Sequence, residues 1–328
     1  METEFLIIGA GFGGLETAIH LRHMSELATI TIVSQEPHLV YKPWLVYLPA
    51  QRRQFDQCLI PLEHVAEQFR LRLVVDTVTK VSPDERQVRL TSGASMHYAQ
   101  VVIATGSAAD REAIAGAQLH AVFPCEVEEA QRFREHFLAM KQGTVTLIIG
   151  GPRPGPGLEY AGWMARSLQE KHLVGAIHLQ LIDSQPHLMA QLGARASSML
   201  ERIMSKQGVQ LLTGQAVQEI TPSEVYLHDE LRIASDLTAV VGPLRGVDLK
   251  LPRPLIDESG FVCVNASFQS PSHPDLFAVG DAVALPWGTD VPKTMGMARK
   301  QAEIVAHNLL AQAGNPCTHS PGKISART

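Results

Sequence analysis

Residues 5–14 read FLIIGAGFGG, an apolar run that ends in a glycine-rich turn, and this stretch decides the fold. Gly9, Gly11 and Gly14 are in the GxGxxG register. In that motif the first glycine makes a tight turn, the second lets the backbone approach a pyrophosphate, and the third permits close helix–strand packing. Because a short strand precedes the turn and a helical pattern follows it, we interpret it as a dinucleotide-binding turn rather than a merely flexible one.

The same plan occurs a second time about 140 residues later in the chain. The first unit continues from the Gly9 turn through a helical pattern to a strand at residues 28–33. The second has a strand at 145–149, a turn at 150–157, a helix at 158–171 and a strand at 177–182. Strand, turn, helix and strand form a βαβ unit, so we predict an α/β protein with two Rossmann-like, doubly wound domains.

The composition excludes several other classes of protein. The 328 residues are 45% hydrophobic and 19% charged, with a net charge of −5 and no block of like charge, which argues against disorder and against nucleic-acid binding. The four cysteines form no CxxC pair and the histidines no HExxH motif, so we propose no metal. An acidic start without a signal peptide, and no run of about 18 apolar residues, predict a cytoplasmic protein without a transmembrane anchor.

A ribose-binding acid is expected about 20 residues beyond the first glycine turn. Ser34 stands at that place and Glu36 follows two positions later. Two alternatives stay open, since either Glu36 turns inward or the Ser34 hydroxyl makes a weaker contact. A third is that Glu36 is only a surface charge.

A second signal lies near the C-terminus, where Gly280-Asp281 follows the run Leu276-Phe277-Ala278-Val279. An aspartate after a strand-ending glycine suits a hydrogen bond to a sugar-alcohol hydroxyl of a flavin, although alone it is more often a helix cap. Lys293 and Thr294 then open a helical stretch at 294–312. The N–H groups of Thr294 and Met295 would stabilise the negative charge of a reduced flavin ring.

These blocks resemble a known superfamily, the pyridine nucleotide–disulfide oxidoreductases, and within it the sulfide:quinone oxidoreductases and type II NADH dehydrogenases. The resemblance covers residues 1–312 and is carried by the Gly9 turn, 40–44 (VYKPW), 104–106 (ATG), 242–248 (GPLRGVD), 276–281 and 291–294 (VPKT) with Met297-Ala298. It implies FAD, tethered covalently or not. The contacts it implies are Gly9, Gly11, Gly14, Lys42, Thr105, Gly106, Gly280 and Asp281.

The chain departs from the sulfide enzymes at their redox cysteines. Arg153 stands where the resembled family has one cysteine, and the C-terminal segment that carries the other, touches the membrane and completes the quinone pocket has no counterpart. We therefore expect no polysulfide chemistry through a cysteine pair, and a more open flavin face. Cys125 aligns with a further cysteine of that family and is a candidate thiol, although it is more often a small residue at a helix start.

Glu159 matches a glutamate that the resemblance places at the start of the second helix, facing the flavin. Such a carboxylate is able to relay protons if burial raises its pKa, although an acid there also simply suits the helix dipole. Asp183 ends the following strand and would favour NADH over NADPH. Against NAD(P)H, Pro152, Pro154 and Pro156 remove N–H donors from a turn two residues longer than the dehydrogenase pattern.

We therefore predict an FAD-dependent oxidoreductase that passes two electrons from a small reductant to a quinone or another acceptor. Glu159, Lys293 and Cys125 are the candidate catalytic residues. Residues 1–110 and 243–328 would form the FAD domain, with a loose tail at 314–328, and 111–242 the second domain. Two alternatives stay open, an NAD(P)H-oxidising flavoenzyme and a degenerate flavoprotein that serves as a binding or electron-transfer subunit. The oligomeric state also stays open, with a homodimer among the options.

Overall fold

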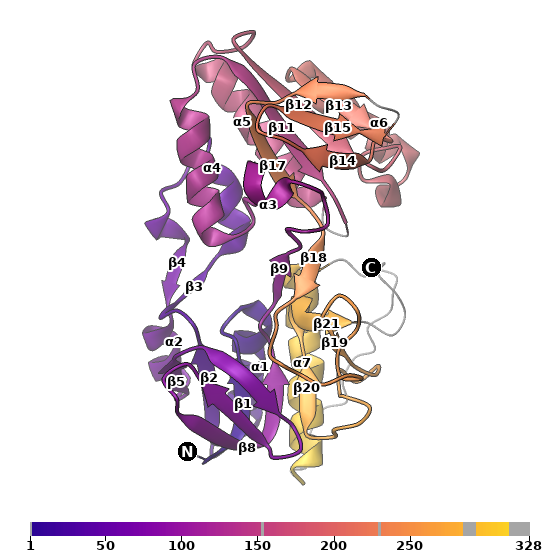
Figure 1. Ribbon diagram of the computed structural model, residues 1–328. Helices are drawn as coiled ribbons and strands as arrows, with labels where there is room; N and C mark the ends of the chain where they lie inside the picture. The colour runs from indigo at the N-terminus through magenta and orange to yellow at the C-terminus, as the bar shows by residue number, and fades with distance from the viewer. Residues whose placement is uncertain (1, 152–153, 229–230, 285–292, 315–328) are drawn as a thin grey trace. The chain divides into compact units, whose positions relative to one another are not determined.

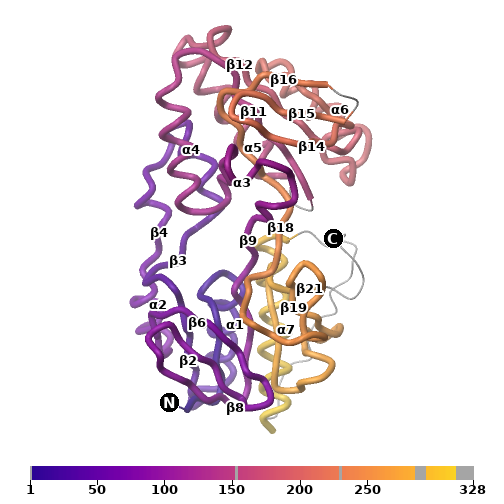
Figure 2. The backbone as a smooth tube through the Cα atoms, in the orientation of Figure 1, coloured from indigo at the N-terminus to yellow at the C-terminus, as the bar shows by residue number. Residues whose placement is uncertain are grey.

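The computed structural model describes residues 2–151, 154–228, 231–284 and 293–314. By the contacts among its residues the chain divides into two compact units. Unit 1 comprises residues 1–39, 60–108 and 245–328, and unit 2 comprises 40–59 and 109–244. The first and last parts of the chain, indigo and yellow in Figure 2, thus belong to the same unit.

Unit 1 is built on a seven-stranded sheet in the order β5-β2-β1-β8-β7-β6, with β20 paired to β8. Its elements (Figure 1) are β1 (Glu2–Ile8), α1 (Phe12–Met24), β2 (Ile30–Ser34), α2 (Leu62–Gln68), β5 (Arg72–Val75), β6 (Val78–Ser82), β7 (Gln87–Leu90), β8 (Ser95–Ile103), β19 (Val262–Cys263), β20 (Leu276–Ala278), the short 3-10 helix η5 (Gly280–Ala282), β21 (Val283–Ala284) and α7 (Met295–Gln312). Strands β5, β2, β1, β8 and β20 are parallel. Four short strands form two further pairs, namely β3 (His38–Val40) with β4 (Leu59–Pro61), and β9 (Ser107–Ala109) with β18 (Leu244–Gly246).

Unit 2 repeats this plan with a five-stranded parallel sheet in the order β10-β17-β11-β12-β13. Its elements are η1 (Lys42–Tyr47), η2 (Asp56–Cys58), α3 (Ala117–His120), β10 (Ala121–Val122), α4 (Val127–Ala139), β11 (Gly143–Ile149), α5 (Gly155–Glu170), β12 (Ile177–Asp183), η3 (Ala190–Leu192), α6 (Ala194–Lys206), β13 (Val209–Thr213), β14 (Val217–Ile220), β15 (Glu224–Leu227), β16 (Arg232–Ala234) and β17 (Leu237–Val241). Strands β14, β15 and β16 form a separate antiparallel sheet.

The two sheets share a reversal of strand order that positions ligands in doubly wound folds. In unit 1 the chain runs from β1 to β2 on one side and later places β8 on the other side of β1. In unit 2 it runs from β11 to β12 and later places β17 beside β11. A crevice opens at the carboxyl ends of the strands where the order reverses. Both predicted glycine turns follow these central strands, which confirms the predicted fold class.

Two details differ from the expectations. Helix α5 begins at Gly155 rather than at residue 158, because a proline at the second helical position needs no hydrogen-bonded N–H. Residues 40–59, which we expected in the first domain, pack in unit 2. The reason is apolar contact, since Val46 belongs to the core beside β11, and Leu45, Leu48 and Cys58 form a buried cluster with Ala130 of α4.

Candidate functional site

The Gly9 turn lies at the reversal point of the unit 1 sheet. The N–H of Gly9 donates a hydrogen bond to Val33 O of β2 at 2.8 Å. Gly9 has φ +104°, and a Cβ there would lie 2.5 Å from Ala104 O, at the end of β8. Only glycine fits this left-handed and crowded position. The turn is thus held between the ends of the two strands that flank β1.

Gly14 and Gly11 have opposite surroundings, and both suit a nucleotide. A Cβ on Gly14 would lie 2.0 Å from Gly9 O, so α1 packs directly on the turn. Gly11 is the N-cap residue of α1, and no side chain caps the helix there. Among the described residues, a Cβ on Gly11 would meet nothing closer than Ala104 O at 3.9 Å. Open space at an uncapped helix N-terminus suits an anion such as a pyrophosphate.

The end of β8 contributes Thr105 and Gly106, both half-buried. Gly106 has φ +72°, and no atom of the described part of the chain lies within 4 Å of where its Cβ would be. The next residue, Ser107, donates its hydroxyl to Asp281 Oδ2 at 3.5 Å, a long contact. The open face of this segment therefore borders the Asp281 carboxylate.

The Gly280–Asp281 turn follows β20, which is paired in parallel with β8. Val279 N donates to Ile103 O at 3.0 Å and continues that pairing. A Cβ on Gly13 would lie 3.2 Å from Val279 Cγ1 and 3.5 Å from Gly280 N, so the first turn of α1 touches this turn. The structure thus brings together, at one sheet edge, seven of the predicted cofactor residues: Gly9, Gly11, Gly14, Thr105, Gly106, Gly280 and Asp281.

Lys293 and the start of α7 lie beside the same turn. Lys293 Nζ donates to Asp281 O at 2.7 Å and to Val283 O at 2.9 Å, and it lies 4.0 Å from the centre of the Phe261 ring. Thr294 caps α7, accepting a hydrogen bond from Met297 N at 3.3 Å. The ammonium group holds the backbone of the turn and brings a positive charge to it. Residues 291 and 292 of the VPKT block lie outside the described residues.

The expected adenosine end of the site contains Ser34 at the end of β2. Ser34 is buried, and its carbonyl accepts a hydrogen bond from Asp76 N at 2.9 Å, whereas Glu36 is exposed. The end of β2 therefore carries a buried serine. The cofactor contacts of Ser34 and of Glu36 both stay predictions.

Three predicted site residues belong to unit 2. Lys42 is exposed at the first position of η1. Cys125 is half-buried and directly precedes Glu126, the N-cap residue of α4, so it occupies a helix start. Glu159 lies on α5 and is exposed, yet desolvation by nearby protein atoms raises the pKa of its carboxyl. Because that exposure screens the charge, we interpret the effect as modest.

The glycine turn of unit 2 is chemically different. Pro154 and Pro156 at the start of α5 carry no N–H, and Gly157 N donates to Pro154 O at 3.1 Å, so fewer helix donors remain here than at the start of α1. Asp183 is buried at the end of β12, where its Oδ1 accepts a hydrogen bond from Gln185 N at 2.9 Å and desolvation raises the pKa of its carboxyl. Pro152 and Arg153 lie outside the described residues.

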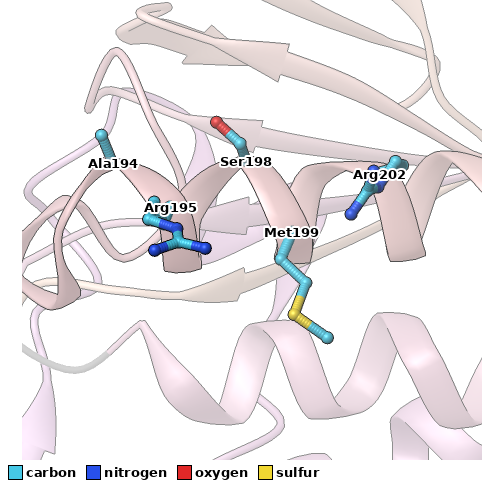
Figure 3. Close-up of a pocket in the computed structure, with 5 residues that line it drawn as sticks. All are labelled: Ala194, Arg195, Ser198, Met199 and Arg202. Atoms are coloured by element: carbon cyan, nitrogen blue, oxygen red, sulfur yellow. The ribbon is translucent and has the colours of Figure 1, made fainter.

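A hollow of about 440 Å³ lies on the exposed face of α6 (Figure 3). The described residues that line it all come from that helix, and no predicted site residue is among them: Ala194, Arg195, Ser198, Met199 and Arg202. We assign the candidate site to the crevice of unit 1, because the Gly9 turn, the Gly280–Asp281 turn and Lys293 converge there.

Within the described ranges, no cluster of three or more His, Cys, Asp or Glu residues is arranged for a metal ion. Likewise, none of the described helices combines the length and apolarity needed to cross a membrane.

The comparisons with known proteins identify the family of this chain. The family model described as "Pyridine nucleotide-disulphide oxidoreductase" matches residues 3–302. The chain belongs to this family. As a member of this flavoprotein family, it is 25% identical to the sulfide-quinone reductase of Aquifex aeolicus, over 100% of this chain and 80% of the relative.

The family relationship extends to further proteins. The chain is 26% identical to an NADH dehydrogenase-like protein of Mycobacterium tuberculosis, over 86% of this chain and 73% of the relative. The solved sulfide:quinone oxidoreductase of Aquifex aeolicus superposes with a TM-score of 0.86 at 24% identity, covering 96% of this chain and 78% of the other. This pyridine nucleotide-disulphide oxidoreductase is thus related to sulfide-quinone reductases and NADH dehydrogenase-like proteins.

Two residues of the site were not predicted from the sequence. Ser107 contacts Asp281, and Gln301 Oε1 accepts a hydrogen bond from Gly280 N at 2.7 Å. Ser107 directly follows the predicted Gly106, so the strand end offered a signal for it. Gln301 lies inside α7, and no local motif marks it.

Proposed function

We propose that this chain is an FAD-dependent oxidoreductase that binds the flavin in the crevice of unit 1. It would pass two electrons from a small reductant to a quinone or another acceptor. The observation that carries the proposal is the meeting of the Gly9 turn with the Gly280–Asp281 turn, next to the open Gly11 position. The residues present fit the cofactor, since a Cβ at Gly11 would project into the space that a pyrophosphate needs.

Each part of the crevice has a distinct role in this proposal. The N-terminus of α1 binds the pyrophosphate through its N–H groups and its dipole, and the Asp281 carboxylate accepts a hydrogen bond from a ribityl hydroxyl. Lys293 holds the turn that presents Asp281 and adds a positive charge. When bound, FAD supplies the two-electron chemistry that amino-acid side chains lack.

Two residues of unit 2, Glu159 and Cys125, keep their sequence-predicted roles as part of this proposal. Glu159 would carry protons, because its raised pKa keeps part of the population protonated closer to neutral pH. Cys125 stays a candidate thiol. We propose that the Gly150 turn does not bind NAD(P)H stably, since Pro152, Pro154 and Pro156 carry no N–H and Gly157 N already donates to Pro154 O.

The test is reconstitution followed by anaerobic reduction. The purified chain, incubated with FAD and freed of excess by gel filtration, should retain a flavin absorbance spectrum. Mixing with sulfide, another small reductant or NADH then identifies the donor class, and bleaching by NADH within seconds would instead support the NAD(P)H-oxidising alternative. A colourless protein after reconstitution would refute the proposal. Retained flavin that none of these reductants bleaches would favour a binding or electron-transfer subunit.

A further inference from the structure

We propose that Gln301 is the positioning residue of the Gly280–Asp281 turn, and that its amide oxygen holds this turn in the form that binds the flavin. The inference rests on the proposed function of unit 1 and adds a residue that contacts neither the proposed cofactor nor a reacting group. Gln301 lies on α7 and is only 3% exposed. Its Oε1 accepts the hydrogen bond of Gly280 N at 2.7 Å.

Gly280 needs such a partner because the sheet pairing ends one residue earlier. Val279 N donates to Ile103 O of β8, and the chain then turns at Gly280 with φ +74°. The left-handed conformation points the Gly280 N–H away from the β8 pairing and toward α7. A partly buried N–H without an acceptor costs free energy, so the Gln301 oxygen stabilises this conformation over others.

The packing around the turn makes α7 the element that sets its position. A Cβ on Gly280 would lie 3.6 Å from Ala298 Cβ, so α7 approaches the turn at Ala298 and, one helical turn later, at Gln301. On the other side, Gly13 of α1 lies against the same backbone. The turn is therefore held between the two helices whose N-termini border the proposed flavin site.

Three points then fix the backbone that presents the Asp281 carboxylate. They are the β8 pairing at Val279, the Gln301 amide at Gly280, and the Lys293 ammonium at the carbonyls of Asp281 and Val283. Of these, only the Gln301 contact uses a neutral side chain that can be replaced without changing charge. Gln301 is thus the point at which the position of Asp281 can be altered most selectively.

The experiment compares Gln301→Leu, which removes the acceptor at similar size, with Gln301→Glu, which keeps an oxygen at the same reach. The control is Gln100→Leu on β8. Gln100 is also buried and donates its Nε2 to Leu309 O of α7 at 3.2 Å, away from the turn. Hydrogen–deuterium exchange of a peptide covering 276–284 is measured without FAD, and FAD affinity is measured by fluorescence quenching.

We expect Q301L to speed amide exchange in this peptide and to weaken FAD binding, each by about tenfold or more. Q301E keeps the acceptor oxygen but adds a buried charge, so its exchange should stay slower than that of Q301L, and Q100L should change neither the exchange nor the FAD affinity. Unchanged exchange in Q301L would overturn the inference whatever the flavin does. If exchange rises in Q301L but FAD binding equals that of the wild type, the turn does not position the flavin and the functional part fails. Wild-type protein that binds no FAD would instead refute the proposed function, while the exchange data still decide whether Gln301 holds the turn. If Q301L does not fold, Gln301→Met serves as the second acceptor-free variant, with the same expected and contradicting results.

Discussion

The Gly9 turn of unit 1 and the Gly150 turn of unit 2 follow equivalent strands of their sheets, and the same tripeptide, Gly-Leu-Glu, lies at the start of the helix after each turn. The geometries of the two turns nevertheless differ. Gly14-Leu15-Glu16 starts at the third residue of α1, and Gly157-Leu158-Glu159 starts at the third residue of α5. A Cβ on Gly14 would lie 2.0 Å from the Gly9 carbonyl oxygen, whereas one on Gly157 would meet the Ile149 side chain at 2.7 Å. The connection between strand and helix spans residues 9–11 in unit 1 and 150–154 in unit 2.

This difference separates the fold from the function. Both turns end the central strand of a parallel sheet at its reversal point, so either position is suited to a ligand. In unit 1 the helix packs on the turn backbone, and the open Gly11 face remains for a phosphate. In unit 2, Pro154 and Pro156 at the start of α5 carry no N–H, and Gly157 N already donates to Pro154 O. A repeated βαβ unit therefore does not imply a repeated binding site.

The largest contrast is expected from alanine at the two equivalent glycines. Gly14→Ala forces a Cβ against a backbone oxygen that cannot move without disrupting the turn, and we expect a loss of about 3 kcal/mol or more in the free energy of unfolding. The Cβ of Gly157→Ala would lie 2.7 Å from Ile149 Cγ1 and 3.6 Å from Val241 Cβ, and because side chains shift more easily than the turn backbone, we expect a smaller loss of about 1–2 kcal/mol. Urea unfolding followed by circular dichroism measures both. Equal losses would show that the two helices pack alike.

The next contrast concerns the two strand-end aspartates. Asp281→Ala should weaken FAD binding about tenfold to a hundredfold, because it removes a charged hydrogen-bond acceptor from the crevice. Asp183→Ala should leave FAD binding unchanged, since Asp183 belongs to unit 2 and accepts the hydrogen bond of Gln185 N. Calorimetric titration with FAD measures both affinities, and a matching loss in the Asp183 variant would remove the distinction.

A third contrast uses the glutamates of the repeated tripeptide. Desolvation modestly raises the pKa of the exposed Glu159 carboxyl, so its acid form persists to somewhat higher pH than that of a free glutamate, and the rate of any step that takes its proton falls as pH rises through that pKa. Glu159→Gln should slow reoxidation of the reduced flavoprotein by a soluble quinone about a hundredfold and flatten its pH profile. The matched control is Glu16→Gln, because Glu16 Oε1 pairs instead with Arg299 Nε at 2.7 Å. Stopped-flow traces that keep the wild-type pH profile in Glu159→Gln would exclude this proton-carrying role.

The smallest effect is expected on the pH dependence of stability, from the buried carboxylate of Asp183. Desolvation raises its folded-state pKa above the unfolded value, so ionisation lowers stability as pH rises through the folded pKa. Asp183→Asn keeps an acceptor for Gln185 N and removes the charge. The variant should match the wild type at acid pH and be the more stable one at neutral pH, as thermal unfolding at several pH values would reveal. A variant that is less stable at neutral pH would contradict the sign of this effect.

Much of the fold followed from short-range patterns in the sequence. The Gly9 turn, the strand ends shortly before Gly106 and Gly280, and the start of α7 beside Thr294 were predicted because glycine and capping residues act on their immediate neighbours. Residues 40–59 could not be assigned to unit 2, since that assignment depends on apolar packing of Val46 and Leu48 on distant elements. Gln301 was missed for the same reason, because only tertiary packing brings it to Gly280.

The measurement that tests the central claim most directly is an FAD titration of Gly11→Ala and Gly155→Ala beside the wild type. Both glycines lie at the start of a helix that follows a central strand, and a Cβ at either one would meet no atom of the described residues closer than 3.9 Å, so we expect neither variant to lose stability. We predict that the wild type and Gly155→Ala bind FAD alike and that Gly11→Ala binds it at least about tenfold more weakly. Equal binding by Gly11→Ala, or lost binding in Gly155→Ala alone, would contradict the assignment of the flavin to unit 1.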